Sequence, residues 1–232
     1  MEFAPEGPKA IPLWINGHAF LTVTGSFFDV VNPLTGEAVH RVPLCGQQEA
    51  DEAVAAARNA QAAWAAATPA TRQAFLDALA VALDSYSGHF AKLLSAEAGL
   101  GEAEALAEVA DAEEALCSTV VGQPGVVAIV VDATRPLAGF VAAAAPALRA
   151  GATVIVKPSP KAPAAAFALC ELSARVDWPG GVLNLMQGDS AAISGLCAAA
   201  IDRLEYVGAA ALGAQVGAIA EATGKPWAMV KA

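Results

Sequence analysis

The second half of the chain alternates short strand-like segments with segments of helical length, and this alternation limits the fold more than any other feature. The strand-like segments lie at residues 125–131, which are fully apolar, and at 153–156, 182–186, 203–207 and 227–230. The helical segments lie at about 136–150, 163–175, 191–199 and 210–223. Short, continuously apolar strands are typical of parallel sheets that are covered on both faces. Right-handed crossovers between them predict an α/β fold with an open, doubly wound sheet of five parallel strands.

The chain before this alternation divides into two stretches. Residues 1–46 contain short β-rich segments around Asn-Gly and Asn-Pro turns, which predict hairpin strands. Residues 47–122 are helical in pattern, and Thr68-Pro69 is a cap sequence that begins the second helix. With the alternating β/α part at 123–232, we interpret the whole chain as one domain.

A third helical piece is expected at 97–114, where acidic residues are frequent. No Lys or Arg occurs between Lys92 and Arg135. Such a run usually forms a solvated face of a helix, and we prefer this interpretation to a docking surface for a basic partner.

Charge and hydropathy exclude two classes of partner. The chain has 232 residues and a net charge of -10, whereas proteins that bind nucleic acid gather Lys and Arg. The apolar run at 137–156 is interrupted by Pro146, Arg149 and Gly151, so it predicts a helix and a strand rather than a membrane span. We therefore expect neither a nucleic-acid partner nor a membrane.

The four cysteines are scattered without a CxxC pair, and the N-terminus lacks the basic and apolar pattern of a signal peptide. These features predict a cytoplasmic protein with four buried thiols. The three histidines are dispersed, and Glu102 and Glu104 do not have the spacing that places two carboxylates on one helix face. No metal site is predicted.

Candidate binding residues follow three of the predicted strands. Ligands of open α/β sheets bind at the carboxyl ends of the strands. The usual G-x-G-x-x-G turn is missing after the first strand, where Gly125 is followed by two valines. The residues at the other strand ends that we select are Lys157, Ser159, Gly188, Gly208, Ala209 and Leu212.

Five segments, at 14–17, 31–37, 53–58, 146–159 and 179–184, occur in the order and register of the aldehyde dehydrogenase superfamily. The chain resembles the cofactor-binding half of that superfamily from about Leu13 to its last residue. The resemblance implies a Rossmann-like domain that binds NAD or NADP, with NAD(P)-dependent aldehyde oxidation as the family activity. It places Lys157 and Ser159 beside the adenosine ribose, and Gly208 and Ala209 near the pyrophosphate.

The sequence departs from the family pattern at both ends of this expected cofactor site. Pro160 stands where the family has a ribose-binding glutamate, and Ala209 replaces a phosphate-facing serine. Losing such a contact costs about 1–3 kcal/mol, or roughly ten- to a hundredfold in affinity. We therefore expect binding of NAD or NADP to be weak or lost.

The departures at the family's catalytic positions are larger. Thr134 stands in place of the asparagine that helps to form the oxyanion hole, and Val230 in place of the general base. The sequence also stops before the family's nucleophilic cysteine is expected. The long arm that the family uses for subunit association is missing before residue 125, so any assembly is expected to use another surface.

Four interpretations follow from the sequence. The first is a catalytically inactive domain that weakly binds a nucleotide or binds a protein partner, which would cover the face left open by the missing catalytic domain. The second is a cofactor-binding subunit of an NAD(P)-dependent aldehyde oxidoreductase whose catalytic cysteine is on another chain. The third is a structural remnant without a ligand, and the fourth is a shortened form of a longer enzyme. Thr134 and Val230 argue against the fourth, because shortening a competent enzyme would not change these two positions.

Overall fold

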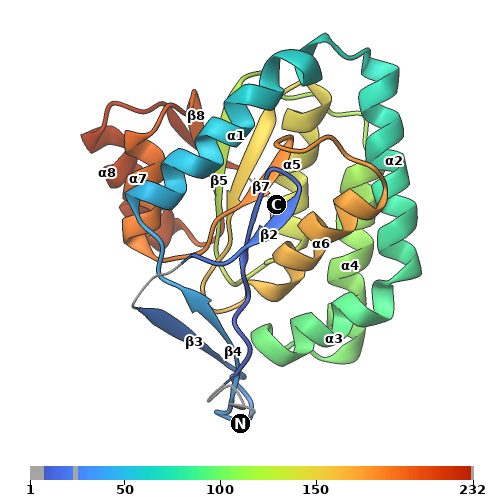
Figure 1. Ribbon diagram of the computed structural model, residues 1–232. Helices are drawn as coiled ribbons and strands as arrows, with labels where there is room; N and C mark the ends of the chain where they lie inside the picture. The colour runs from blue at the N-terminus through green and yellow to red at the C-terminus, as the bar shows by residue number, and fades with distance from the viewer. Residues whose placement is uncertain (1–7, 23–25, 231–232) are drawn as a thin grey trace, which may run out of the picture.

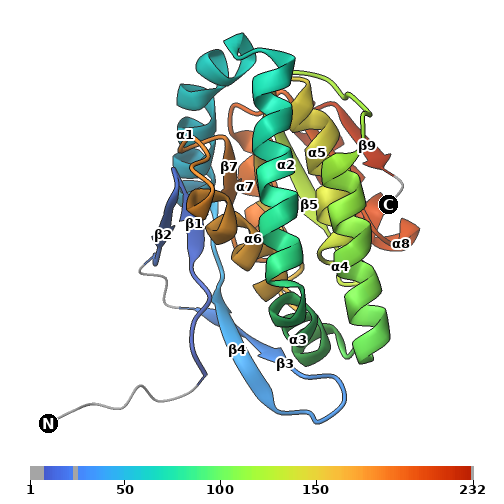
Figure 2. The same ribbon diagram turned by 90° about the vertical axis from the view of Figure 1, so that its right-hand side faces the viewer.

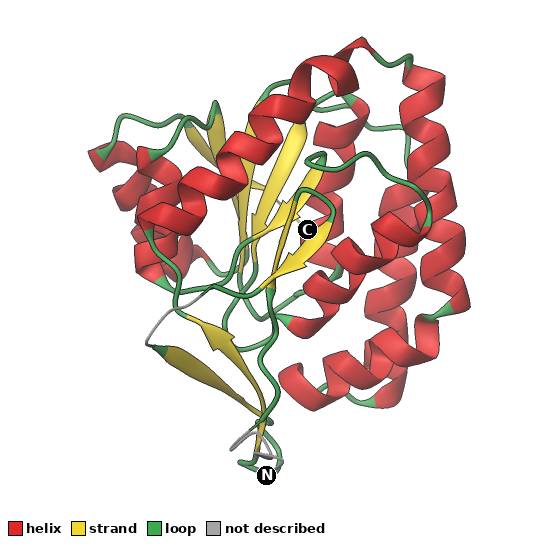
Figure 3. Ribbon diagram, viewed as in Figure 1, coloured by secondary structure: helices red, strands yellow, loops and turns green. Residues whose placement is uncertain are grey.

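The computed structural model describes residues 8–22 and 26–230, and it is built around one mixed sheet between two layers of helices (Figures 1 and 3). The strand order is β2-β1-β7-β6-β5-β8-β9. The five strands from β7 to β9 are parallel, which confirms the predicted doubly wound sheet. Their bounds are β5 Val126–Val131, β6 Thr153–Lys157, β7 Leu183–Leu185, β8 Arg203–Val207 and β9 Trp227–Val230.

The N-terminal strands divide between this sheet and a separate hairpin. β1 (Leu13–Ile15) and β2 (His18–Phe20) extend the main sheet antiparallel at its β7 edge, where Trp14 is in register with Leu185. The sequence predicted short strands here but not their place in the main sheet. β3 (Phe27–Val31) and β4 (Ala38–Pro43) form a separate two-stranded sheet, which Figure 2 shows below the main body, and Ala10 forms an isolated parallel bridge with Arg41 of β4.

Different helices cover the two faces of the sheet, as Figure 1 shows. Alternate residues of β5 face opposite cores, with Ile129 toward one and Ala128 toward the other. The first core is covered by α5 and α6, with α2, α3 and α4 outside them, and the second by α1, α7 and α8. The helix bounds are α1 Gln47–Ala66, α2 Pro69–Ser85, α3 Ser87–Ala98, α4 Glu102–Cys117, α5 Ala138–Arg149, α6 Ala164–Arg175, α7 Ser190–Ala198 and α8 Ala210–Ala222. Within the described residues, no helix combines the length and the apolar character needed to cross a membrane.

The acidic stretch differs from the predicted continuous, solvated helix. Gly99 takes a left-handed conformation with φ of 70° and ends α3, so the stretch is divided between α3 and α4. Glu97 and Glu108 are buried. Glu97 accepts a hydrogen bond of 2.7 Å from the backbone N–H of Ala164, at the start of α6. The solvated acidic face was therefore the wrong interpretation for these two residues.

Glu108 connects α4 to the start of α5. Its Oε1 accepts hydrogen bonds from the backbone N–H groups of Leu137 and Ala138, at 3.2 and 2.9 Å, and its Oε2 accepts from Arg135 Nε at 3.2 Å. The carboxylate therefore satisfies N–H groups that a helix terminus leaves without intrahelical partners.

Replacing Glu108 with alanine is expected to lower the free energy of unfolding by about 2 kcal/mol, because it leaves two buried N–H groups unpaired. Urea unfolding of the two proteins measures the loss. Glu114→Ala, at an exposed position of the same helix, is the matched control and should change stability by less than about 0.5 kcal/mol. Equal effects of the two substitutions would contradict the capping role of Glu108.

Candidate nucleotide pocket

A cavity of about 330 Å³ lies at the carboxyl ends of β5 and β6, between α7 and α8. Apolar side chains of β5, α7 and α8 form most of its walls, and polar residues that follow the strands line the rest. The apolar lining residues are Val130, Val131, Pro160, Ile193, Leu212, Val216 and Ile219. The polar ones are Asp132, Lys157, Ser159, Lys161, Asp189, Ser190 and Gln215. An apolar cleft with a few convergent polar groups is the usual form of a small-molecule site.

Lys157 is the buried cation of this pocket. It is the last residue of β6 and lies two residues after Ile155, which faces the α1, α7 and α8 core, so its side chain leaves the sheet on the same face. Only 4% of Lys157 is exposed, and its ammonium group has no hydrogen-bond or ion-pair partner among the described residues. Burial lowers the pKa of Lys157 to about 8, although the nearby charge of Asp189 acts in the opposite direction. The Nζ atom of Lys157 is not among the fully enclosed, unpaired side-chain atoms of the described residues, so it reaches the open space of the pocket and can donate to an oxygen atom of a ligand there.

Asp132 stands where the sheet reverses its winding, between β5 and β8. One carboxylate oxygen accepts a 2.7 Å hydrogen bond from the Ala209 N–H and a 3.3 Å bond from the Tyr206 hydroxyl. The other accepts bonds from the Thr134 N–H, at 2.8 Å, and from the Thr134 hydroxyl. Burial favours the protonated acid, but these hydrogen bonds outweigh it and hold the pKa of Asp132 below its ordinary value.

Gly208 brings the backbone unusually close to this carboxylate. Its φ is 144°, a value that residues with a side chain rarely adopt, and an added Cβ would lie 2.1 Å from Asp132 Cγ. Ala209 is the N-cap residue of α8 and provides no side-chain cap for that helix. The Asp132 carboxylate therefore occupies the concave backbone site that Gly208 and Ala209 form before α8.

The six residues predicted from the strand ends fall into three places. Lys157, Ser159 and Leu212 line the pocket. Gly208 and Ala209 adjoin it through Asp132. Gly188 does not line the pocket, although the next residue, Asp189, does; an added Cβ at Gly188 would be 2.8 Å from the Ala192 side chain and 3.1 Å from the Cys45 backbone, so close packing accounts for this glycine. Asp132 was not selected from the sequence, although it follows a buried strand as Lys157 does.

None of the four thiols lines this pocket, so the described residues place no cysteine nucleophile in it. Cys45, Cys170 and Cys197 are buried, and burial raises the pKa of Cys45 to about 12 and shifts the pKa values of the other two upward as well. Cys117 is exposed at the end of α4, so the prediction of four buried thiols was wrong for this residue.

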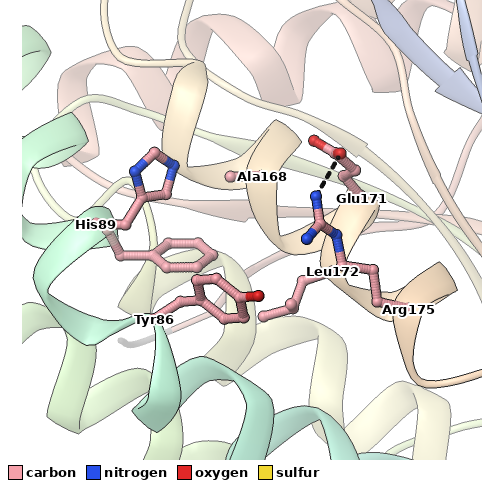
Figure 4. Close-up of a pocket in the computed structure, with 7 residues that line it drawn as sticks. Tyr86, His89, Ala168, Glu171, Leu172 and Arg175 are labelled. Atoms are coloured by element: carbon pink, nitrogen blue, oxygen red, sulfur yellow. Dashed lines mark hydrogen bonds and ion pairs between the residues drawn. The ribbon is translucent and has the colours of Figure 1, made fainter.

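A second cavity of similar volume lies on the other side of the sheet, between the α2–α3 junction and α6 (Figure 4). Tyr86, His89 and Leu172 contribute to its lining, and its charged pair, Glu171 and Arg175, is joined by an exposed ion pair of 3.2 Å. Its charged groups are already paired with each other, and it is remote from the strand ends. We therefore assign the candidate site to the pocket between α7 and α8.

Comparison with known proteins identifies the family to which this chain belongs. The aldehyde dehydrogenase family model matches residues 20–123 and 113–230. The chain belongs to the aldehyde dehydrogenase family. Glutarate-semialdehyde dehydrogenase of Pseudomonas putida is 31% identical over 228 residues, a match that covers 88% of the chain and 48% of that enzyme. A succinate-semialdehyde dehydrogenase of Escherichia coli, named for NADP+, is 29% identical over 87% of the chain and 47% of the enzyme.

Solved structures of this family agree with the fold. Lactaldehyde dehydrogenase from Escherichia coli superimposes with a TM-score of 0.89 at 23% identity, over 96% of this chain and 52% of that one. A Pseudomonas syringae aldehyde dehydrogenase, solved with NAD+ and octanal, superimposes with a TM-score of 0.83 at 27% identity. This match covers 99% of the present chain and 51% of the Pseudomonas syringae chain. The chain thus spans about half the length of the relatives that it matches.

Proposed function

We propose that this aldehyde-dehydrogenase-like domain is catalytically inactive and weakly binds a nucleotide in the pocket between α7 and α8. One observation carries the proposal: Lys157 is buried without a partner among the described residues, in a cavity with apolar walls. A hydroxyl-bearing ribose would give the ammonium group the hydrogen bonds that it lacks, and the apolar walls would contact the attached ring.

The pocket fits only part of NAD or NADP, the cofactors that the names and titles of its relatives mention. Lys157 fits a ribose hydroxyl. Pro160, which lines the pocket, supplies no carboxylate to accept a second ribose hydrogen bond. At the start of α8, the Ala209 N–H is not free to bind a pyrophosphate, because it already donates to the Asp132 carboxylate. Weak binding is the expected result.

Three features support the absence of catalysis by this chain. Thr134 holds the position of the oxyanion asparagine by resemblance, and its N–H and hydroxyl both donate to Asp132. Val230, at the position of the general base, cannot accept a proton. The three buried thiols have raised pKa values, which opposes formation of a nucleophilic thiolate.

Calorimetric titration of the chain with NAD and NADP tests the binding. We expect saturable binding with Kd near or above about 1 mM, which Lys157→Ala abolishes. Lys92→Ala, at an exposed position of α3, is the control for loss of a positive charge and should bind as the unmodified chain does. Binding that survives Lys157→Ala would contradict this pocket, whereas micromolar binding that depends on Lys157 would support a cofactor-binding subunit whose catalytic cysteine is on another chain.

A protein partner is the second candidate, and the edge strand β9 favours it. Within the described residues β9 pairs only with β8, and Met229 on β9 is 47% exposed. Open strand edges are templates for pairing with another chain. Such a partner would reduce hydrogen exchange of the β9 amides in the complex. The four free thiols support a reducing compartment, the cytoplasm, as the place where this binding occurs.

A further inference from the structure

We propose that the Asp132 carboxylate acts as a built-in substitute for a phosphate at the start of α8, so that the pocket binds adenosine more tightly than its 5′-phosphorylated forms. This inference rests on the nucleotide pocket proposed above and concerns which part of the nucleotide can enter it. The chemical class of ligand is an uncharged nucleoside, for which adenosine is the probe.

The position of Asp132 is one where an anion would otherwise be bound. In a doubly wound sheet the crevice forms where the winding reverses, here between β5 and β8, and phosphates bind there at a helix N-terminus. Asp132 follows β5, and Gly208 and Ala209 follow β8. The carboxylate accepts the Ala209 N–H at 2.7 Å, and it fills the space beside Gly208 so closely that an added Cβ would overlap it.

The charge of Asp132 is not neutralised by a cation. Among the described residues it forms no ion pair, and its partners are N–H and O–H groups of Thr134, Tyr206 and Ala209. Hydrogen bonds hold its pKa low, so the carboxylate is ionised at neutral pH. A phosphate at the start of α8 would therefore meet both a filled space and a like charge.

The other end of the pocket retains its means of binding a ligand. Lys157 lines the same cavity, is 4% exposed and has no partner in the described part of the chain. Asp189 is the carboxylate whose charge acts on Lys157, and it also caps α7 by accepting the Ala191 N–H at 3.0 Å. The charges of Asp132 and Lys157 thus do not neutralise each other. The pocket presents the Lys157 ammonium group, which can donate to sugar hydroxyls, and the Asp132 carboxylate, which repels a phosphate.

Titration of the full chain with adenosine and with AMP, at matched ionic strength, tests the inference. We expect adenosine to bind at least about tenfold more tightly than AMP. Asp132→Asn removes the charge at nearly constant volume and should reduce that ratio to about threefold or less. Asp84→Asn, at an exposed position of α2, makes the same change in net charge and should leave the ratio unaltered.

If Asp132→Asn fails to fold, the unmodified chain provides a second measurement. Raising the salt concentration screens the repulsion, so the preference for adenosine over AMP should decrease as salt increases. If AMP binds the unmodified chain as tightly as adenosine does, the proposed role of Asp132 is wrong. The same holds if Asp132→Asn leaves the ratio of the two affinities unchanged. Neither result would contradict the pocket itself. No binding of adenosine, or binding that Lys157→Ala leaves intact, would instead overturn the proposed pocket and this inference with it.

Discussion

Replacing Lys157 with methionine is expected to raise the free energy of unfolding by about 3 kcal/mol at pH 7. Only 4% of Lys157 is exposed, its ammonium group has no hydrogen-bond partner among the described residues, and its pKa is lowered from 10.5 to about 8, chiefly by burial. Each unit of such a shift corresponds to about 1.4 kcal/mol of disfavoured charge. Methionine keeps the length of the side chain without the charge.

The effect of this substitution should depend on pH in a defined direction. Because the pKa of Lys157 is lower in the folded chain than in the unfolded one, the unfolded chain binds more protons between about pH 8 and pH 10.5. The stability of the unmodified chain should therefore rise across that window relative to Lys157→Met. The advantage of methionine is complete below pH 8 and lost above pH 10.5.

Urea unfolding of both proteins at pH 7 and at pH 10 measures this difference. Lys161→Met is the matched control, because Lys161 lines the same pocket but is exposed, and its replacement should change stability by less than about 0.5 kcal/mol. A methionine variant that is less stable than the unmodified chain at pH 7 would show that Lys157 is not an unpaired buried charge. If the prediction holds, the fold tolerates a destabilising lysine at the position where a ligand would contact it.

The parallel sheet could be predicted because burial on both faces leaves a plain pattern in the sequence. β8 and β9 begin and end where the sequence predicts strands, since both local composition and the sheet require strands there. The junction of β1 with β7 could not be predicted in the same way. It depends on the pairing of Trp14 with Leu185, residues far apart in the chain, and β1 has only three residues.

The same contrast applies to the pocket. Lys157 could be selected because it follows an apolar strand, and the strand-end rule alone places it near a ligand. Asp132 follows a strand too, but its importance depends on the contact with Ala209, which the winding of the sheet creates. Glu108 was misjudged for a related reason, since a helix neighbour rather than its own sequence neighbours decides that it is buried.

Gly208→Ala is expected to have the largest effect on stability, a loss of about 4 kcal/mol. Two costs combine at this position. A residue with a side chain is strained at φ of 144°, which costs about 1–3 kcal/mol, and the new methyl group would lie 2.1 Å from Asp132 Cγ, which adds about 1–3 kcal/mol of overpacking. Gly36→Ala separates the two costs, because Gly36 also has a positive φ, of 74°, but an added Cβ there meets nothing within 4 Å.

A double-mutant cycle of Gly208→Ala with Asp132→Ala shows whether the carboxylate causes the second cost. If it does, Gly208→Ala should lose about 1–3 kcal/mol less in the Asp132→Ala background than in the unmodified chain, as measured by urea unfolding of the four proteins. Additive effects, or a loss at Gly208 no larger than that at Gly36, would mean that the carboxylate does not occupy the space beside Gly208. A coupled loss would instead show that glycine is required at this position to admit the protein's own carboxylate at the start of α8. That result would connect the stability of the domain directly to the weaker binding of phosphorylated ligands in its pocket.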